Sequence, residues 1–269
     1  KPGDLVLDLG TGTGVLAMFA AQQKPKKIYA LDHSGIVELA SSIAAHNQFD
    51  CIEFIQKNSR EFSADERLDW IIHEQIGDYL FEENMVHNLL DLKSRLLKED
   101  GKILPGKFQF YLEPVCLTDE HRIPFVWEEP IHGVDFSFLK SAEIAGKYRG
   151  DGDDTIMLES RSAEYLVCQP DPLVSFDLNT IKSADEIPHA VTKTKIAARS
   201  GSVDGLSLYF DVIFDDETRF DTSLMSTRTH WDRVFYRLPR RKVEAGDELT
   251  VRFEAGELAD PGSWTVSLD

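Results

Sequence analysis

Three glycines at alternate positions follow a short apolar run near the start of the chain. The run is Val6–Leu9, and the glycines are Gly10, Gly12 and Gly14. Glycines between a strand and a helix let the backbone approach a ligand closely, at the carboxyl end of a sheet and beside a helix N-terminus. The dinucleotide spacing Gly-x-Gly-x-x-Gly would need a glycine at Val15. The feature therefore predicts a strand–loop–helix ligand site and disfavours a nicotinamide or flavin cofactor.

Short apolar runs and helical stretches alternate through residues 1–105. This order predicts a mostly parallel sheet covered by helices, an α/β domain. A turn is expected at Asp100-Gly101, before a strand that begins with Ile103. The other expected strands are Asp4–Leu9, Ile28–Leu31, Ile52–Ile55 and Leu68–Ile72, and the expected helices are Val15–Gln23, Ile36–His46 and Glu82–Leu97.

From Pro105 onward, apolar and polar residues alternate with period two. This pattern predicts an antiparallel all-β region over residues 106–269. Residues 118–149 fit neither pattern, and we interpret them as an excursion from the β region. The clearest alternating runs are Val174–Leu178, Leu206–Phe214 and Leu249–Phe253, with turns expected at Asp204-Gly205, Ala245–Asp247 and Pro261-Gly262.

Two acidic residues stand out in the first two expected strands. Asp8 interrupts an otherwise apolar strand, where an unpaired carboxylate would be costly. We expect it to organise the glycine loop or to accept a hydrogen bond from an amino group of the ligand. Asp32 ends the second strand, where a carboxylate can accept both hydroxyl groups of a ribose. Taken alone, Asp32 would fit a helix cap equally well, but the glycine loop favours ligand binding.

A pair of glutamates follows the fourth expected strand, at the kind of strand end where open α/β sheets place their chemistry. Glu74 and Glu83 are nine positions apart, and Gly77 allows a tight bend between them. Such a loop can point both carboxylates at one cationic guest. Considered alone, the two residues fit ordinary surface acids at the start of a helix better.

Three separated motifs resemble those of the protein arginine methyltransferases. Glu74–Met85 fits every fixed position of that family's double-glutamate loop, in outline Glu-x-x-Gly-x-x-Leu-x-x-Glu-x-Met. The glycine loop, with the Met-Phe-Ala-Ala sequence that begins at Met18, resembles the family's cofactor motif. Thr229-His230-Trp231 resembles the family's Thr-His-Trp loop. The resemblance extends over essentially the whole chain.

The resemblance implies a reaction and its participants. It implies transfer of a methyl group from S-adenosylmethionine to the guanidinium of arginine residues in a basic protein or peptide. Glu74 and Glu83 would hold the guanidinium as catalytic residues, and His230 would help to remove a proton. Trp231 would line the arginine stem. Met85 would lie at the substrate, and it weakly favours asymmetric dimethylation.

The resemblance also implies a fold and an assembly. A Rossmann-like cofactor-binding domain, residues 1–105, would be followed by a β-barrel-like substrate domain, residues 106–269. A helical arm at about residues 118–149 would join two chains into a homodimer, with Trp127 and Phe136 as interface anchors. The chain enters a strand almost at its first residue, so we expect the natural protein to begin earlier, with the family's helices that cover the cofactor.

The chain departs from the family pattern in the double-glutamate loop and near the cofactor's adenine. Gln75 stands where an aromatic residue is usual, and His73 stands where serine is common. The acid expected near the adenine falls at Ser59-Arg60-Glu61, where a gapless alignment puts Arg60 in its place. The expected cofactor-binding residues are therefore Asp8, Gly10, Gly12, Gly14, Asp32, Ser59 and Glu61.

The chain carries 47 acidic and 29 basic residues, a formal net charge of −18. This charge repels nucleic acid and attracts basic peptides, although it also serves solubility alone. No apolar run is long enough to cross a bilayer, and we expect no secretory signal. Cys51, Cys116 and Cys168 are odd in number and widely spaced, which predicts reduced thiols and neither a disulfide framework nor a metal site. We expect a cytoplasmic protein, also nuclear in a eukaryote, that binds neither nucleic acid nor membrane.

Two other functions fit the same residues. Departures such as Gln75 allow a methyltransferase that acts on a small guanidino compound or another non-protein acceptor. A non-catalytic scaffold would use the acidic surface and the arm to bind basic partners. The intact Glu74 and Glu83 argue against the scaffold.

Overall fold

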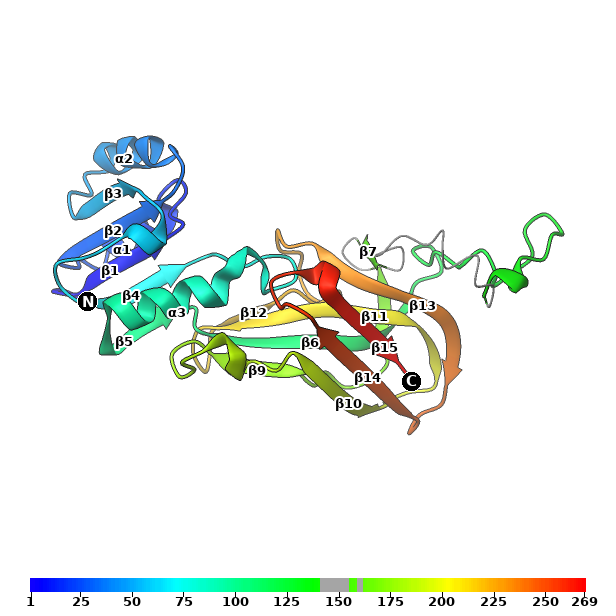
Figure 1. Ribbon diagram of the computed structural model, residues 1–269. Coiled ribbons are helices and arrows are strands. Elements are labelled where there is room, and N and C mark those ends of the chain that lie inside the picture. Colours follow the sequence, from blue (N-terminus) through cyan, green and yellow to red (C-terminus); the bar gives the residue numbers. More distant parts are fainter. Residues whose placement is uncertain (141–154, 159–161) are drawn as a thin grey trace.

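The computed structural model describes residues 1–140, 155–158 and 162–269, with only the backbone of residues 155–158. An α/β part and an antiparallel β part lie side by side (Figure 1). The α/β part has a parallel five-stranded sheet of order β3-β2-β1-β4-β5. The strand order reverses between β1 and β4, and open α/β sheets bind ligands at such a reversal. Its elements are β1 (Leu5–Leu9), α1 (Val15–Ala21), β2 (Lys27–Asp32), α2 (Val37–His46), β3 (Ile52–Gln56), η1 (Ser59–Glu61), β4 (Leu68–His73), η2 (Glu82–Asn84), α3 (Met85–Leu96) and β5 (Leu97–Leu104).

Strand β1 is buried along its whole length because helices cover both faces of the sheet. Val6 belongs to an apolar cluster with Ala17 of α1. Leu7 belongs to a second cluster with Leu89 of α3. A strand covered on both faces needs a continuous apolar sequence, and this need explains the run that ends at the glycine loop. Among the described residues, no helix has the length and apolarity that spanning a membrane requires.

The antiparallel part consists of two packed sheets. The larger sheet has the order β7-β13-β11-β6-β8, with β12 on β11 and β9 on β6, and the smaller sheet has the order β10-β14-β15. Phe110 of β6 packs against Phe253 of β14 and Trp264 of β15, with ring centroids 5.3 and 5.9 Å apart. The strands are β6 (Lys107–Leu117), β7 (Thr155–Leu158), β8 (Ala163–Leu166), β9 (Val174–Asp177), β10 (Ala190–Ile196), β11 (Gly201–Ile213), β12 (Arg219–Asp221), β13 (Arg233–Val243), β14 (Glu248–Ala255) and β15 (Trp264–Leu268), with short helices η4 (Ala184–Glu186) and η5 (Pro261–Ser263).

The expected fold class is confirmed: a parallel Rossmann-like sheet is followed by an antiparallel β part. Within the described strands, pairing gives two sheets and not one closed barrel. Phe81, from the loop after β4, packs on Phe110 and Phe176, with ring centroids 5.5 and 5.7 Å apart. The two parts therefore share one apolar core.

The turn expected at Asp204-Gly205 was wrong, because its glycine serves a close approach between strands, whereas the chain does bend at Asp100-Gly101. Asp100-Gly101 lies inside β5, among the extra residues that β5 carries at a register shift in its pairing with β4. A side chain at Gly101 would come within 2.7 Å of Leu97. Asp204-Gly205 lies inside β11 at another register shift, where a side chain at Gly205 would collide with the carbonyl of Tyr236. The expected turns at Ala245–Asp247 and Pro261-Gly262 do separate strands.

Residues 118–140 project from the antiparallel part between β6 and β7 (Figure 1, green). This segment, called the arm below, ends in the short helix η3 (Ser137–Lys140). Residues 141–149 of the expected arm lie outside the described residues. Trp127 stacks on Phe125 of its own chain, with ring centroids 4.5 Å apart, and Phe136 is half-buried. The strongly exposed apolar side chains of the arm are Ile123, Val126, Ile131, Val134 and Phe138.

Candidate active site

The glycine loop between β1 and α1 adopts the left-handed conformation that its glycines permit. Gly10, Gly12 and Gly14 have φ angles of 70°, 53° and 81°. The backbone N–H of Gly12 donates to Oδ2 of Asp32 at 3.0 Å. The loop is therefore fixed to the end of β2, at the carboxyl edge of the sheet.

Asp8 lies beneath this loop and is fully buried. Its Oδ2 accepts hydrogen bonds from the hydroxyl of Thr11 at 2.6 Å and the N–H of Ala17 at 3.0 Å. Its Oδ1 is buried without a partner among the described residues. Burial raises the pKa of Asp8 to about 6, against the two hydrogen bonds, which lower it. Asp8 thus organises the loop, as expected, and keeps one acceptor atom for a further donor.

Asp32 ends β2 and lines a cavity of about 240 Å³. Its Oδ1 accepts from the N–H and the hydroxyl of Ser34 at 2.9 and 2.8 Å. Burial raises the pKa of Asp32, but the hydrogen bonds from Ser34 and Gly12 outweigh it and hold the pKa below its ordinary value. A carboxylate with this environment stays ionised and can accept from sugar hydroxyls.

The cavity brings together residues from five places in the sequence. Of the expected cofactor residues, Gly10, Asp32 and Ser59 line it directly. Glu61 is exposed, and Arg60 lines the cavity instead. Sequence reasoning missed the other polar lining residues, although all but one follow strand ends. They are His33, Lys57, Asn58, Gln75 and Asn88.

The loop after β4 folds into a tight bend that carries both expected catalytic glutamates. The N–H of Leu80 donates to the carbonyl of Gly77 at 2.9 Å, and Oε2 of Glu82 accepts from the N–H of Tyr79 at 3.0 Å. A side chain at Gly77 would collide with Glu82, so the bend requires glycine. Glu83 has a φ of 60°, unusual for a residue with a side chain, and conformations of this kind gather at functional sites.

Glu74, Glu83 and His230 gather at one exposed site. Oε1 of Glu74 lies 3.4 Å from Nε2 of His230. Burial raises the pKa of Glu74, His230 opposes this, and the negative charge of Glu83 raises the pKa further. The carboxylates of Glu74 and Glu83 are therefore close enough to repel each other. A cation placed between them would relieve that repulsion.

The loop around Trp231 is tied to the double-glutamate loop. The indole N–H of Trp231 donates to the carbonyl of Ile76 at 2.7 Å. The N–H of Asp232 donates to Oδ1 of Asp78 at 2.6 Å. These bonds position His230 beside Glu74, and no local sequence signal indicates them.

Two residues expected at the substrate are buried in this structure. Trp231 is buried and stacks on Phe220, with ring centroids 5.1 Å apart, so it supports the loop more than it lines an open channel. Met85 is 0% exposed and packs in the main core. Met85 begins α3, and its side chain belongs to the face of α3 that is buried against the sheet.

Comparisons with known proteins agree with this geometry. Residues 1–120 match a methyltransferase domain. Residues 107–260 match the arginine methyltransferase oligomerization subdomain. The chain belongs to the protein arginine methyltransferase family. The resemblance inferred from the three motifs is thereby confirmed.

Individual relatives support the same family. Protein arginine N-methyltransferase 1 of Schizosaccharomyces pombe is 31% identical over 256 residues, which are 91% of this chain and 71% of that protein. Protein arginine N-methyltransferase 6 of Danio rerio is 30% identical over 239 residues, 86% of this chain and 67% of that protein. The PRMT1 enzyme–prozyme heterotetrameric complex with AdoHcy from Trypanosoma brucei superposes with a TM-score of 0.80 at 30% identity, covering 99% of this chain and 83% of that chain. The open protein arginine methyltransferase 10 of Arabidopsis thaliana, at 21% identity, has a TM-score of 0.78, covers 99% of this chain and 84% of that chain, and shows the same fold.

Proposed function

We propose that this arginine methyltransferase family member transfers a methyl group from S-adenosylmethionine to a guanidinium nitrogen of arginine residues in basic proteins. The observation that carries the proposal is the meeting of Glu74 and Glu83 on one bend, beside the cavity at the carboxyl end of β1 and β2. We assign residues 1–105 to cofactor binding and residues 106–269 to substrate and subunit binding.

The residues of the cavity fit S-adenosylmethionine. Asp32 would accept the ribose hydroxyls. Asp8 does not line the cavity but lies beneath its glycine loop, where its unpaired Oδ1 would accept from the amino group. The left-handed Gly10 leaves room for close approach of the ligand to the backbone. When bound, the cofactor supplies an activated methyl group on a sulfonium cation.

Glu74 and Glu83 would receive the acceptor guanidinium, which stays protonated near neutral pH. A second cation beside a sulfonium is unfavourable without anions nearby. One charge pair at about 4 Å and an effective dielectric near 20 is worth about 4 kcal/mol. The two carboxylates also accept the forked donors of the guanidinium and fix its orientation for in-line attack.

His230 would carry away the proton that the acceptor nitrogen loses. Oε1 of Glu74 takes the proton from the methylated nitrogen and passes it to Nε2 of His230, 3.4 Å away. His230 is exposed, so its ring exchanges protons with water. The methylated guanidinium keeps its positive charge, and one proton is released for each methyl group transferred.

Cofactor affinity is expected to rise with pH because Asp8 must be ionised to accept from an ammonium group. With a pKa of about 6 in the free protein, affinity should rise about tenfold between pH 5 and pH 7. Titration calorimetry with S-adenosylhomocysteine would measure this. Asp8→Asn should flatten the profile, and an unchanged profile in that variant would place the titrating group elsewhere.

The pKa of Asp8 has a second consequence, for the free protein. A raised pKa means that the folded form binds the proton more tightly than the unfolded form. Asp8 therefore adds stability below its ordinary pKa of 3.8, and this stability is lost as the pH rises through about 6.

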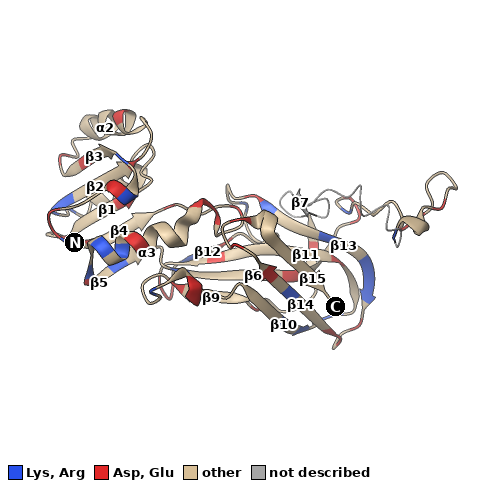
Figure 2. Ribbon diagram, viewed as in Figure 1, with Lys and Arg blue, Asp and Glu red and all other residues tan. Residues whose placement is uncertain are grey.

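A basic protein substrate agrees with the charge and openness of the site. Acidic residues occur on both parts of the molecule (Figure 2), in keeping with the net charge of −18. The test is a methylation assay with labelled cofactor, offered an arginine-rich peptide, a matched lysine peptide and free guanidino compounds. Labelling of the arginine peptide alone supports the proposal. Labelling of the free compounds alone would indicate a small-molecule enzyme, and no labelling would indicate a scaffold.

We further propose that two copies associate through the arm. The family match to an oligomerization subdomain and the exposed apolar side chains of the arm support this. Val15, Phe19 and Leu39, on α1 and α2, form a second set of exposed apolar side chains that an arm could cover.

Phe138→Asp is expected to convert the dimer to a monomer, because Phe138 is 74% exposed and would be buried in the pair. Light scattering after size-exclusion chromatography measures the mass. Ile196→Asp is the control, since Ile196 is 53% exposed but lies on β10, away from the arm. A monomeric natural protein, or equal loss in both variants, would refute the assignment.

A cytoplasmic location, or a nuclear one in a eukaryote, also remains our proposal. Cys51, Cys116 and Cys168 are free thiols, and two of them are buried, which suits a reducing compartment.

A further inference from the structure

The cavity assigned to the cofactor has an unusual wall beyond Asp32. The segment after β3 contributes Lys57, Asn58 and Arg60 to it, and Asp32 is the only acidic residue among its lining residues. Within the described part of the chain, the guanidinium of Arg60 forms no hydrogen bond or ion pair. This end of the cavity therefore offers hydrogen-bond donors and positive charge.

The position of Arg60 is fixed by the surrounding structure. Arg95 of α3 donates to the carbonyls of Ser59 and Phe62 at 3.0 and 2.9 Å, on either side of Arg60. Oδ2 of Asp91 accepts from Nη2 of Arg95 at 2.7 Å and so holds Arg95 in place. The side chain of Asn58 caps the short helix by accepting from the N–H of Arg60 at 3.0 Å. These contacts occupy the carbonyl of Ser59 and the amide oxygen of Asn58, two acceptors that a ligand could otherwise use.

A purine next to this wall would meet the donors of Arg60 and Lys57, and, Asp32 apart, the side chains of the lining that can accept are neutral, such as Ser59 and Gln75. The 6-amino group of adenine needs an acceptor, which neither Arg60 nor Lys57 can provide. A 6-oxopurine presents two acceptors, O6 and N7, the pair that an arginine fork matches best. With the ribose on Asp32, we place the base against η1 and Arg60, which line the same cavity.

We propose that Arg60 makes the nucleobase site tolerant of a 6-oxo base, so that the inosine analogue of the cofactor binds about as tightly as the adenosine form. This inference rests on the proposed function, since it assumes that the cavity holds the nucleoside of the methyl donor. It assigns to Arg60 the role of a specificity-determining residue at the base.

The test compares the dissociation constants of S-adenosylhomocysteine and S-inosylhomocysteine, measured by titration calorimetry. We expect the two constants of the natural protein to agree within about threefold, because no lining carboxylate reads the amino group. Arg60→Glu should create a preference for the adenosine form of about ten- to hundredfold, by supplying an acceptor and removing the donor fork. Glu61→Gln is the matched control, because Glu61 is adjacent and exposed but does not line the cavity.

Three results would overturn the inference. A natural protein that prefers the adenosine form by more than about tenfold reads the amino group by another residue. An unchanged ratio in Arg60→Glu, with both ligands still bound, removes Arg60 from the base site but leaves the proposed function intact. Failure of both ligands to bind the natural protein would overturn the cofactor assignment itself.

Discussion

Replacing Glu74 or Glu83 with glutamine should lower kcat/KM for an arginine peptide by about 100- to 1000-fold. Each change removes one anion from a site that must hold a guanidinium beside a sulfonium. The attraction lost between the carboxylate and the guanidinium is worth at most about 4 kcal/mol. Both glutamates are partly open to solvent, which screens their attraction to the guanidinium. This screening sets the lower end of the expected loss of kcat/KM. The measurement is a steady-state methylation assay at saturating cofactor.

Glu82→Gln is the matched control for both substitutions. It makes the same change of charge in the same loop, but Glu82 accepts from the N–H of Tyr79 inside the bend, and glutamine keeps that acceptor. We expect its rate to stay within about threefold of the natural value. Cofactor affinity should be unchanged in all three variants, because none of these residues lines the cavity. Equal losses in Glu82→Gln and Glu83→Gln would show a general effect of the loop and contradict the assignment.

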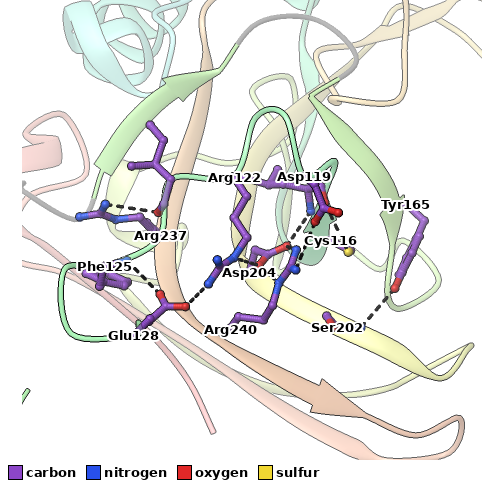
Figure 3. A network of polar contacts seen from close by, with 12 residues as sticks. Cys116, Asp119, Arg122, Phe125, Glu128, Tyr165, Ser202, Asp204, Arg237 and Arg240 are labelled. Atoms are coloured by element: carbon purple, nitrogen blue, oxygen red, sulfur yellow. Dashed lines mark hydrogen bonds and ion pairs between the residues drawn. The ribbon is translucent and has the colours of Figure 1, made fainter. Parts of the chain in front are cut away.

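Asp204→Ala is expected to lower the free energy of unfolding by about 3 to 5 kcal/mol, the largest stability effect that we predict. Asp204 is 3% exposed in β11 and lies at the centre of a polar network at the base of the arm (Figure 3). It accepts from the N–H of Leu117 at 2.9 Å, from Arg122 at 3.1 Å and from Arg240 at 2.6 and 3.0 Å. Alanine would leave two guanidinium groups without their buried acceptor.

Chemical denaturation at neutral pH measures this loss, and Asp119→Ala is the control. Asp119 contacts the same Arg240 at 3.4 Å but is 95% exposed, so its removal should change stability little. Equal effects of the two substitutions would mean that burial at Asp204 does not matter. Because Arg122 belongs to the arm, loss of Asp204 should also weaken the proposed association of two copies.

The same network makes the stability of the fold depend on pH, and the sign of that dependence follows from the pKa of Asp204. Burial raises the pKa of Asp204, but the hydrogen bonds from Arg240, Leu117 and Arg122 outweigh it and hold the pKa below its ordinary value of 3.8. Asp204 therefore stabilises the fold at neutral pH, and this contribution is lost as the pH falls through its lowered pKa. The difference in stability between the natural protein and Asp204→Ala should narrow at that acid limit.

Local patterns predicted the part of the fold that depends on nearest neighbours. The apolar run of β1 and its three glycines indicated a strand buried on both faces and a loop with left-handed backbone, and both are found. The spacing of Glu74, Gly77 and Glu83 likewise indicated a bend, because glycine is required where Glu82 packs against position 77.

Features set by distant contacts could not be predicted from the sequence. The bond from Trp231 to Ile76 joins residues 155 positions apart, so no local pattern predicts it. Only the resemblance of Thr229-His230-Trp231 to the family's loop indicated that His230 lies at the site of Glu74. Asp204-Gly205 has the composition of a turn, but Asp204 binds arginines from two other segments. Ser59 and Arg60 line the cavity and Glu61 does not. The gapless alignment put Arg60 at this place, but the contact with Arg95 of α3 that fixes η1 could not be predicted.

A crystal structure of the protein with S-adenosylhomocysteine and an arginine peptide would test the central claim most directly. Our account predicts one arginine side chain whose guanidinium donates to the carboxylates of both Glu74 and Glu83, with a free nitrogen facing the cofactor sulfur. An arginine bound elsewhere, or a Glu83 that turns away into a separate ion pair, would contradict it.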